Sequence, residues 1–276
     1  ISGTVTTYSV GEAKAPYTLA ILHNNDGESD MLGDSIMVGG SKILGGSVAQ
    51  FKATVDSLRD AAVSRGYGSI MLSSGDNFLA GKEFNASQAN EVYYDAIALD
   101  AIDYDAICIG NHDFDFGAKV LAEMIEAFET NKAPYLSSNL GFSQEPELNA
   151  LAQNGRVKPY TIVQKGNEQI GVVGLTTPKI TEISSPGKVD VSEAIVDSVQ
   201  KYVDTLVNKG INKIILISHL QSVNEDTALI KQISGIDIVI AGGGDELLAN
   251  DPVLGGPYKN TIFGSYPMTE TDKDGN

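Results

Sequence analysis

The sequence predicts an α/β fold in which parallel strands alternate with helices. Five short apolar runs are typical of buried strands, at residues 18–22, 69–73, 104–109, 213–217 and 237–241. Segments with apolar residues at helical spacing occur between or after them, at residues 48–63, 88–99, 116–129 and 192–208. Two further β-rich runs, 157–163 and 169–175, are separated by Lys165-Gly166-Asn167 and are expected to pair as a hairpin. We therefore expect sheets of mixed strand direction.

Composition restricts the kinds of partner that this chain can have. Its 276 residues are enough for one large domain or two small ones. The 36 acidic and 19 basic residues give a net charge of −17, which argues against nucleic acid or an anionic membrane as a binding surface. No apolar run approaches the ~20 residues of a membrane span, so we expect none. The single cysteine, Cys108, lies in an apolar run and is expected to be a buried small hydrophobe.

The chain is expected to have three parts. Residues 1–17 are polar and are interpreted as a leader or a peripheral strand, and residues 18–250 form the main domain. Residues 251–276 form a C-terminal segment whose end has turn composition with no strand after it. We expect a processed mature form, with its signal peptide removed, or an excised piece that stops before a further domain.

Three local patterns complete the prediction. Glycines at residues 33–46 indicate a loop around the site rather than a phosphate cradle, because no Lys-Ser/Thr ending follows them. The polar stretch at 140–155 is expected to be hairpin-like. Ser192 and residues 224–226 are expected to cap helices.

Side chains that bind metals or transfer protons follow five of the predicted strands. They occur in Asn25-Asp26-Gly27-Glu28, Gly75-Asp76-Asn77, Gly110-Asn111-His112-Asp113, Ser218-His219 and Gly242-Gly243-Gly244-Asp245. Each cluster alone is compatible with an ordinary turn, but the carboxyl ends of parallel strands meet at one edge of a sheet. Carboxylates brought together there repel one another unless cations neutralise them. We therefore expect a site for two divalent ions bridged by one acid, which suits phosphoester hydrolysis.

In this order and spacing, the clusters resemble those of the calcineurin-like metallophosphoesterases. The similarity is greatest to the 5′-nucleotidase branch, in the stretches Leu22-His23-Asn24-Asn25-Asp26 and Gly110-Asn111-His112-Asp113-Phe114-Asp115-Phe116-Gly117. It covers residues 18–247. The resemblance implies a four-layer αββα sandwich with mixed sheets and the site at the strand ends.

The resemblance also implies a role for each matching residue. Asp26 would bind the first metal ion, Asp76 would bridge both ions, and Asn111 and His219 would bind the second. The catalytic pair would be His112 and Asp113: His112 would protonate the leaving oxygen or stabilise the transition state, and Asp113 would orient His112.

The chain departs from the family pattern at three ligand positions. The family usually has Asp-x-His in the first motif, where this chain has Glu28, and Gly-His-x-His in the last, where it has Gly243 and Asp245 in place of the histidines. The first ion would then be held by Asp26, Glu28, Asp76 and Asp245, and the second would lose one ligand.

Such oxygen ligands favour Mg²⁺, Ca²⁺, Mn²⁺ or iron over Zn²⁺. We interpret the site as retuned for a hard metal, because random decay would not be expected to leave carboxylates at two of the three changed positions. A decayed site is the alternative, and Glu246 is an alternative ligand to Asp245.

These observations predict an extracellular or periplasmic phosphomonoesterase acting on nucleotides or similar small phosphate esters. The resemblance implies a further C-terminal domain that supplies most of the nucleoside pocket. A cyclic-nucleotide phosphodiesterase is a related alternative. The alternative from another class is a noncatalytic Ca²⁺-binding surface or assembly protein that keeps the fold, although a plain cation cage would need neither His112 nor Asp113. A serine hydrolase lacks support because the sequence has no Gly-x-Ser-x-Gly elbow.

Overall fold

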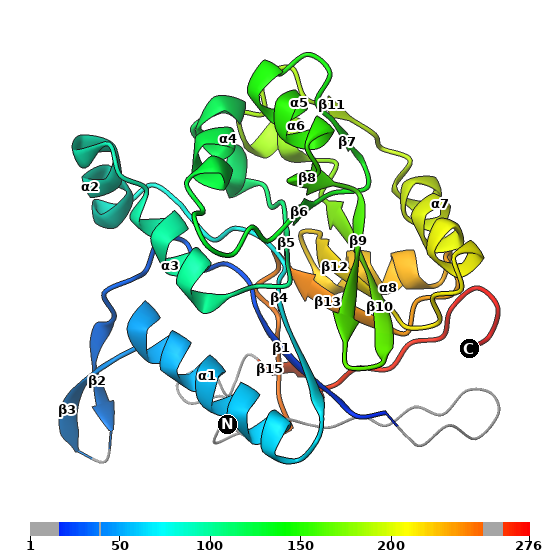
Figure 1. The fold of residues 1–276 in the computed structure, drawn as a ribbon, viewed down its shortest axis with the longest axis horizontal. Coiled ribbons are helices and arrows are strands. Elements are labelled where there is room, and N and C mark those ends of the chain that lie inside the picture. Colours follow the sequence, from blue (N-terminus) through cyan, green and yellow to red (C-terminus); the bar gives the residue numbers. More distant parts are fainter. Residues whose placement is uncertain (1–16, 39, 251–261) are drawn as a thin grey trace.

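Two β-sheets pack face to face between two layers of helices in the computed structural model (Figure 1). The structure describes residues 17–38, 40–250 and 262–276. The predicted αββα sandwich is confirmed. The leader or peripheral strand expected at 1–17 lies outside the described residues except for Tyr17.

The first sheet contains five parallel strands in the order β1-β4-β5-β6-β8. They are β1 (Leu19–Asn24), β4 (Gly68–Ser73), β5 (Ala106–Cys108), β6 (Tyr135–Leu136) and β8 (Val157–Lys158). Three of them are the strands that the sequence predicts before the polar clusters. Their carboxyl ends therefore meet on one side of the sandwich.

The second sheet has the order β13-β12-β10-β9. Its strands are β13 (Ile238–Gly242), β12 (Ile214–His219), β10 (Glu168–Thr176) and β9 (Tyr160–Lys165). β9 and β10 form the predicted antiparallel hairpin, and β10, β12 and β13 are parallel. The run 157–163 is divided between the two sheets, because β8 pairs with β6 while β9 pairs with β10.

Helices cover the outer face of each sheet. The first sheet is covered by α1 (Val48–Ser64), α2 (Lys82–Asn90), α3 (Tyr94–Ile102), α4 (Ala118–Glu126) and α5 (Pro146–Gln153). The second is covered by α7 (Ile195–Asn208) and α8 (Val223–Ile230). Two single turns, the 3₁₀ helix η1 (His112–Phe114) and α6 (Ile180–Ile183), lie in connections.

The layers follow from the two-residue period of the strands. In β4, Ile70 and Leu72 lie in the core between the sheets, and Met71 lies in the core under the helices. In β12, Ile215 and Ile217 face the other sheet in the same way. Fully buried strands of this kind hold the loops at their ends in a fixed position.

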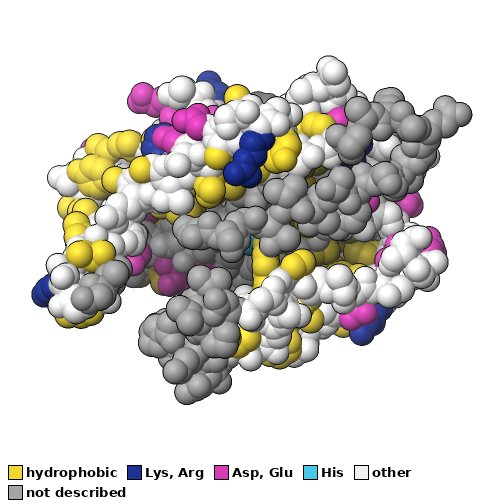
Figure 2. Space-filling view, turned by 90° about the horizontal axis from the view of Figure 1, so that it is seen from below, with side chains coloured by type: hydrophobic (Ala, Val, Ile, Leu, Met, Phe, Trp, Pro, Cys, Tyr) yellow, Lys and Arg dark blue, Asp and Glu magenta, His cyan; other side chains and the backbone are white. Residues whose placement is uncertain are grey.

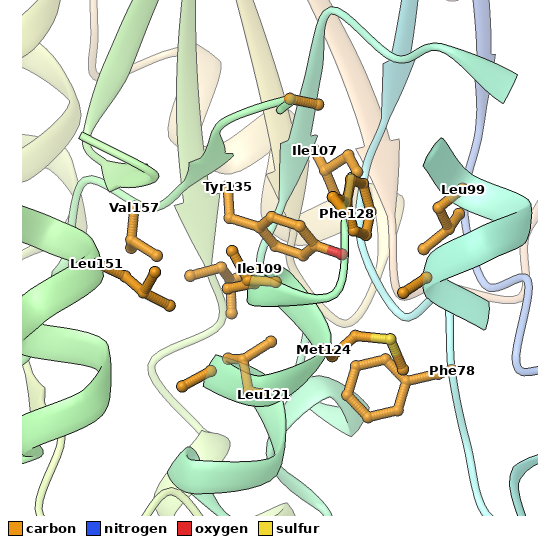
Figure 3. Close-up of a cluster of buried hydrophobic side chains, with 14 of the residues drawn as sticks. Phe78, Leu99, Ile107, Ile109, Leu121, Met124, Phe128, Tyr135, Leu151 and Val157 are labelled. Carbon is orange, nitrogen blue, oxygen red and sulfur yellow. The ribbon is translucent and has the colours of Figure 1, made fainter. Parts of the chain in front are cut away.

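Cys108 lies in the core between the sheets and is fully buried, as predicted. The outer core of the first sheet is rich in large side chains (Figure 3). Tyr135 from β6 and Phe128, which follows α4, meet there edge to face with ring centroids 6.0 Å apart. Ile107 from β5 and Leu121 from α4 lie in the same cluster.

Several local predictions are wrong. The helix expected at 88–99 is two helices, because Glu91 adopts a left-handed conformation with φ 53° and ends α2. The glycine-rich stretch is mostly an antiparallel hairpin, β2 (Asp34–Val38) and β3 (Ser41–Gly45). The region 140–155 contains helix α5. Ser192 does not cap α7, whose N-cap residue is Ala194, and α8 is capped by Ser222 rather than by residues 224–226.

The hairpin β2–β3 extends from the edge of the molecule (Figure 1) and exposes Met37, Ile43 and Leu44. Figure 2 shows hydrophobic side chains at the surface on that side.

Two short pairings tie distant segments to the sandwich. β7 (Leu140–Gly141) pairs with β11 (Asp190–Val191), and β14 (Leu247–Leu248) pairs with β15 (Ile262–Gly264). In the described part of the C-terminal segment, β15 thus pairs with β14, and the Lys273 N–H bonds to the Ile233 carbonyl at 3.0 Å. Among the described residues, no helix combines the length and apolar character needed to cross a bilayer.

Candidate metal centre

The loops that follow β1 and β4 run side by side and extend the pairing of these two strands. The backbone N–H of Asp26 donates to the Gly75 carbonyl at 3.0 Å, and that of Glu28 donates to the Asp76 carbonyl at 3.0 Å. Asp26 and Asp76 both have left-handed backbones, with φ of 52° and 54°. Aspartate tolerates this conformation better than most residues, but it is uncommon and is concentrated at functional sites. The strand ends thus bring two carboxylates together.

Asp76 is at the centre of the site and is only 1% exposed. Its Oδ1 accepts the backbone N–H of His112 at 2.8 Å, and its Oδ2 lies 2.8 Å from Nε2 of His219. One carboxylate therefore joins the turn after β5 in the first sheet to the last residue of β12 in the second.

His219 is fully buried, and both of its ring nitrogens have partners. Nδ1 lies 2.5 Å from the carbonyl oxygen of Ser74, so the Nδ1–H donates to the backbone and Nε2 faces Asp76. Burial alone would lower the pKa of His219. The hydrogen bond and charge of Asp76, with the Ser74 carbonyl, outweigh burial and raise the pKa to about 9. A histidine that donates its other N–H to a carbonyl is oriented as metal-binding histidines are.

Asn111 completes the buried part of the site. Its Oδ1 lies 3.1 Å from Nε2 of His219 and 2.9 Å from Nε2 of Gln221. Asp26, Asp76 and His219 each offer a ligand atom within 4.8 Å of the others. Two carboxylates, an imidazole and an amide oxygen form a donor set that fits a divalent cation.

Glu28 and Asp245 lie at the rim of the site, and both are exposed. Neither belongs to the group formed by Asp26, Asp76 and His219. Burial raises the pKa of Glu28, the charge of His112 lowers it, and the charges of Asp26, Asp76 and Asp245 raise it further. The two rim carboxylates are thus near enough to add to the negative potential, and their role as ligands stays a prediction.

The structure gives His112 a different partner from the one that the resemblance implies. Nδ1 of His112 lies 2.6 Å from Oδ2 of Asp115, so Asp115 rather than Asp113 orients the imidazole. The reason is the 3₁₀ turn η1: with three residues per turn, the side chains of residues i and i+3 lie on the same side. Asp115 also accepts the hydroxyl hydrogen of Ser184 at 2.8 Å.

Asp113 points into the domain and is 1% exposed. Its Oδ2 accepts the backbone N–H of Gly110 at 2.7 Å, which holds the turn that carries Asn111 and His112. Burial and the charge of Asp76 raise the pKa of Asp113. Its predicted catalytic role as the orienting acid is wrong, and its position is that of a buried brace.

Burial lowers the pKa of His112. The hydrogen bond that its Nδ1–H donates to Asp115, with the charges of Asp76, Asp115 and Glu28, outweighs burial and raises the pKa above its ordinary value. The side chain is 33% exposed. An imidazole that is charged more easily than usual, and that still reaches solvent, has the properties of a proton donor.

Three contacting residues were not predicted from the sequence. Asp115 carried a usable signal, because it lies three residues after His112 in a short turn. Ser184 and Gln221 carried none, since they reach the site from segments 69 and 110 residues away from their partners.

The chain is similar to known proteins over most of its length. The chain is 32% identical to a 5′-nucleotidase of Diplobatis ommata over 271 residues, which is 97% of this chain and 44% of that protein. The 5′-nucleotidase precursor of Thermus thermophilus superposes with a TM-score of 0.78 and 31% identity, over 93% of this chain and 46% of that one. These comparisons confirm the resemblance to the 5′-nucleotidases that the sequence motifs indicate.

A likeness of fold alone extends to the calcineurin-like phosphoesterase YfkN of Bacillus subtilis. Its TM-score is 0.60 at 19% identity, over 81% of this chain and 71% of that one. No protein-family model matches the chain. The chain spans less than half the length of the Diplobatis and Thermus proteins.

Proposed function

We propose that this chain is the catalytic domain of a metal-dependent phosphomonoesterase that hydrolyses nucleotides or similar small phosphate esters at a site for two divalent ions. The observation that carries the proposal is the His112–Asp115 pair beside Asp76. A carboxylate that orients an imidazole next to a group of metal ligands is the arrangement of a general acid. The names of the relatives support a nucleotide as the substrate.

In this proposal, Asp26, Asp76, Asn111 and His219 hold the ions, and Asp76 is shared between them. Glu28 and Asp245 add oxygen ligands on the side of Asp26. The bound ions lower the pKa of a water molecule and neutralise charge on the phosphoryl group.

His112 has its Nδ1 fixed by Asp115, so Nε2 is the nitrogen that delivers a proton to the leaving oxygen. Because the backbone N–H of His112 is bonded to Asp76, the proton donor and the ligands move as one unit. This fixed geometry reduces the ordering needed for reaction.

The oxygen-rich donor set supports Mg²⁺, Mn²⁺, Ca²⁺ or iron over Zn²⁺. We also propose that the protein acts outside the cytoplasm, since the Thermus relative is named a precursor. Detection of the protein in cytoplasmic fractions alone would contradict that location. The nucleoside pocket is assigned to a further domain, since the chain spans less than half of its relatives.

Hydrolysis of p-nitrophenyl phosphate by chelator-treated chain, with each metal added in turn, tests the proposed activity. This substrate requires no nucleoside pocket. We expect turnover with Mn²⁺ or Mg²⁺ and less with Zn²⁺. Ca²⁺ bound at the site without turnover in any metal would support the noncatalytic alternative, which the acidic rim formed by Glu28 and Asp245 favours.

A further inference from the structure

Gln221 lies against the candidate metal centre, although neither the sequence pattern nor the relatives' names point to it. It occupies the bend between β12 and α8, two residues after His219. Its side-chain Nε2 lies 2.9 Å from Oδ1 of Asn111. Oδ1 is the atom through which Asn111 would bind a cation, so the amide of Gln221 lies beside a ligand atom.

The surrounding atoms are at hydrogen-bond distances that also match the spacing of adjacent ligands around one ion. Oδ2 of Asp76 is 2.8 Å from Nε2 of His219, and Nε2 of His219 is 3.1 Å from Oδ1 of Asn111. Oδ1 of Asn111 is in turn 2.9 Å from Nε2 of Gln221. Adjacent ligands of an octahedral ion with bonds of about 2.1 Å are about 3.0 Å apart. The four side chains therefore form a series of adjacent ligand positions.

Gly243, the first residue of the turn after β13, has no side chain to offer next to His219. Gly243 has φ 76°, and a Cβ added there would lie 2.6 Å from the Leu220 carbonyl and 2.9 Å from Nε2 of His219. Its backbone N–H donates instead to Oδ2 of Asp26 at 3.3 Å. A further protein ligand on this side of His219 therefore comes from another segment. The bend that carries Gln221 packs directly against this turn, since a Cβ added to Gly244 would lie 3.6 Å from the Gln221 carbonyl.

Gln221 is held in place by its neighbours along the chain. Leu220 is 1% exposed, Ser222 caps α8, and the backbone N–H of Gln221 donates to Oε2 of Glu225 at 3.2 Å. Half a turn about the last side-chain bond exchanges the nitrogen and oxygen of the amide. The same conformer can then donate to Asn111 without a cation and present oxygen to a cation. Little side-chain entropy is lost in that exchange.

We propose that Oε1 of Gln221 is a direct ligand of the cation held by Asp76, Asn111 and His219. The inference deepens the proposed function and rests on it for the presence of that cation. An amide oxygen in this position also agrees with a site that prefers hard metals.

Calorimetric titration of the chelator-treated chain with Mn²⁺ tests this ligand through binding alone. Gln221→Ala removes the ligand and is expected to weaken binding at least about 10- to 100-fold, the range found when a residue that only supports a metal ligand is lost. Gln221→Glu keeps an oxygen in place but has no N–H to donate, so it is expected to bind Mn²⁺ at least as tightly as the parent. Gln232→Ala, at an exposed position just after α8, is the matched control and should bind like the parent.

Two results would overturn the assignment. Parent-like binding by Gln221→Ala would show that the side chain contributes nothing, and equal weakening by Gln221→Glu would show that Gln221 only donates to Asn111. A crystal structure of the Mn²⁺-loaded chain decides directly: Oε1 should lie about 2.2 Å from the ion, and an Oε1 beyond coordination distance rejects the ligand. Turnover is measured separately, so Mn²⁺ bound through Gln221 without hydrolysis would reject the proposed function and leave the ligand assignment intact.

Discussion

Nδ1 of His112 and Oδ2 of Asp115 lie 2.6 Å apart on one turn of 3₁₀ helix. This short contact links the partly exposed imidazole to a carboxylate that is itself fixed by the hydroxyl of Ser184. The pair is the feature that distinguishes a phosphatase site from a plain cation site.

Asp115→Asn should lower turnover by about 10² to 10⁴, the usual contribution of a positioned acid or base. As a proton donor, His112 is active when protonated, so activity falls as the pH rises through its pKa. Asp115 raises that pKa. The variant should therefore move the alkaline limb of the pH–rate profile to lower pH.

Two controls accompany that measurement. Asp113→Asn should leave the alkaline limb in place, because Asp113 bonds to Gly110 rather than to the imidazole. Asp60→Asn, on the exposed face of α1, should behave like the parent. An alkaline limb that moves with Asp113 and not with Asp115 would reverse the assignment.

Ser184→Ala should reduce kcat roughly three- to tenfold with little change in KM. The lost hydrogen bond is worth about 0.5–1.5 kcal/mol, and it acts only through the position of Asp115. Steady-state kinetics should show a lowered kcat for Ser184→Ala. Ser184→Thr keeps the hydroxyl and should recover the parental kcat. Ser185→Ala, one residue further and exposed, should have parental kinetics, and an equal loss there would point to a general disturbance of the segment.

Gly243→Ala should lower the free energy of unfolding by about 2–4 kcal/mol. The cost combines a left-handed backbone with the crowding of His219 and the Leu220 carbonyl. Gly210→Ala is a matched control, because Gly210 also has a left-handed backbone, with φ 82°, but open space around it. It therefore measures the cost of the backbone conformation without crowding. Urea denaturation should show the larger loss at Gly243; equal losses would mean that His219 moves away at no cost.

Asp226 of α8 is 3% exposed. Burial, together with the charges of Glu225 and Glu246, raises the pKa of Asp226 to about 7. The Ser218 hydroxyl and the charge of His219 oppose this shift. A folded-state pKa above the unfolded value near 3.8 means that the folded state loses stability as the pH rises from about 4 to about 7. Asp226→Asn removes that loss. Relative to the parent, the free energy of unfolding of the variant should therefore rise by up to about 4 kcal/mol between pH 4 and pH 8.

The comparison is made by denaturation in the presence of chelator at both pH values. A difference between variant and parent that stays constant with pH would show that Asp226 does not titrate in this range.

The strands were predictable because their signal is local. The apolar runs at 18–22, 69–73 and 213–217 alternate between two cores, and polar residues typical of a turn or a site follow each of them. The hairpin of β9 and β10 was also visible, from two β-rich runs around Gly166.

The errors lie where a short local pattern competes with a longer one. Helix α5 has only eight residues, and its signals, Pro146 at the first turn followed by Glu147, were outweighed by polar composition. The helical period across 88–99 continued through Glu91, whose backbone ends one helix and lets another begin.

In the site, sequence order indicated Asp26, Asp76, Asn111 and His219, because each ends a strand or follows one within three residues. The partner of His112 depended on the type of turn, which decides whether Asp113 or Asp115 lies beside the ring. Ser184 and Gln221 depend on how distant segments pack, and no spacing in the sequence carries that information.

The most direct test of the phosphatase assignment compares turnover and metal content in His112→Ala. The chain and the variant are loaded with Mn²⁺, the bound metal is measured by elemental analysis, and hydrolysis of p-nitrophenyl phosphate is followed under the same conditions. We expect the variant to keep the parental metal content and to lose at least about 10²-fold in turnover, because His112 transfers a proton and does not bind metal. Equal turnover in the two proteins, or a parallel loss of metal and activity, would contradict the assignment.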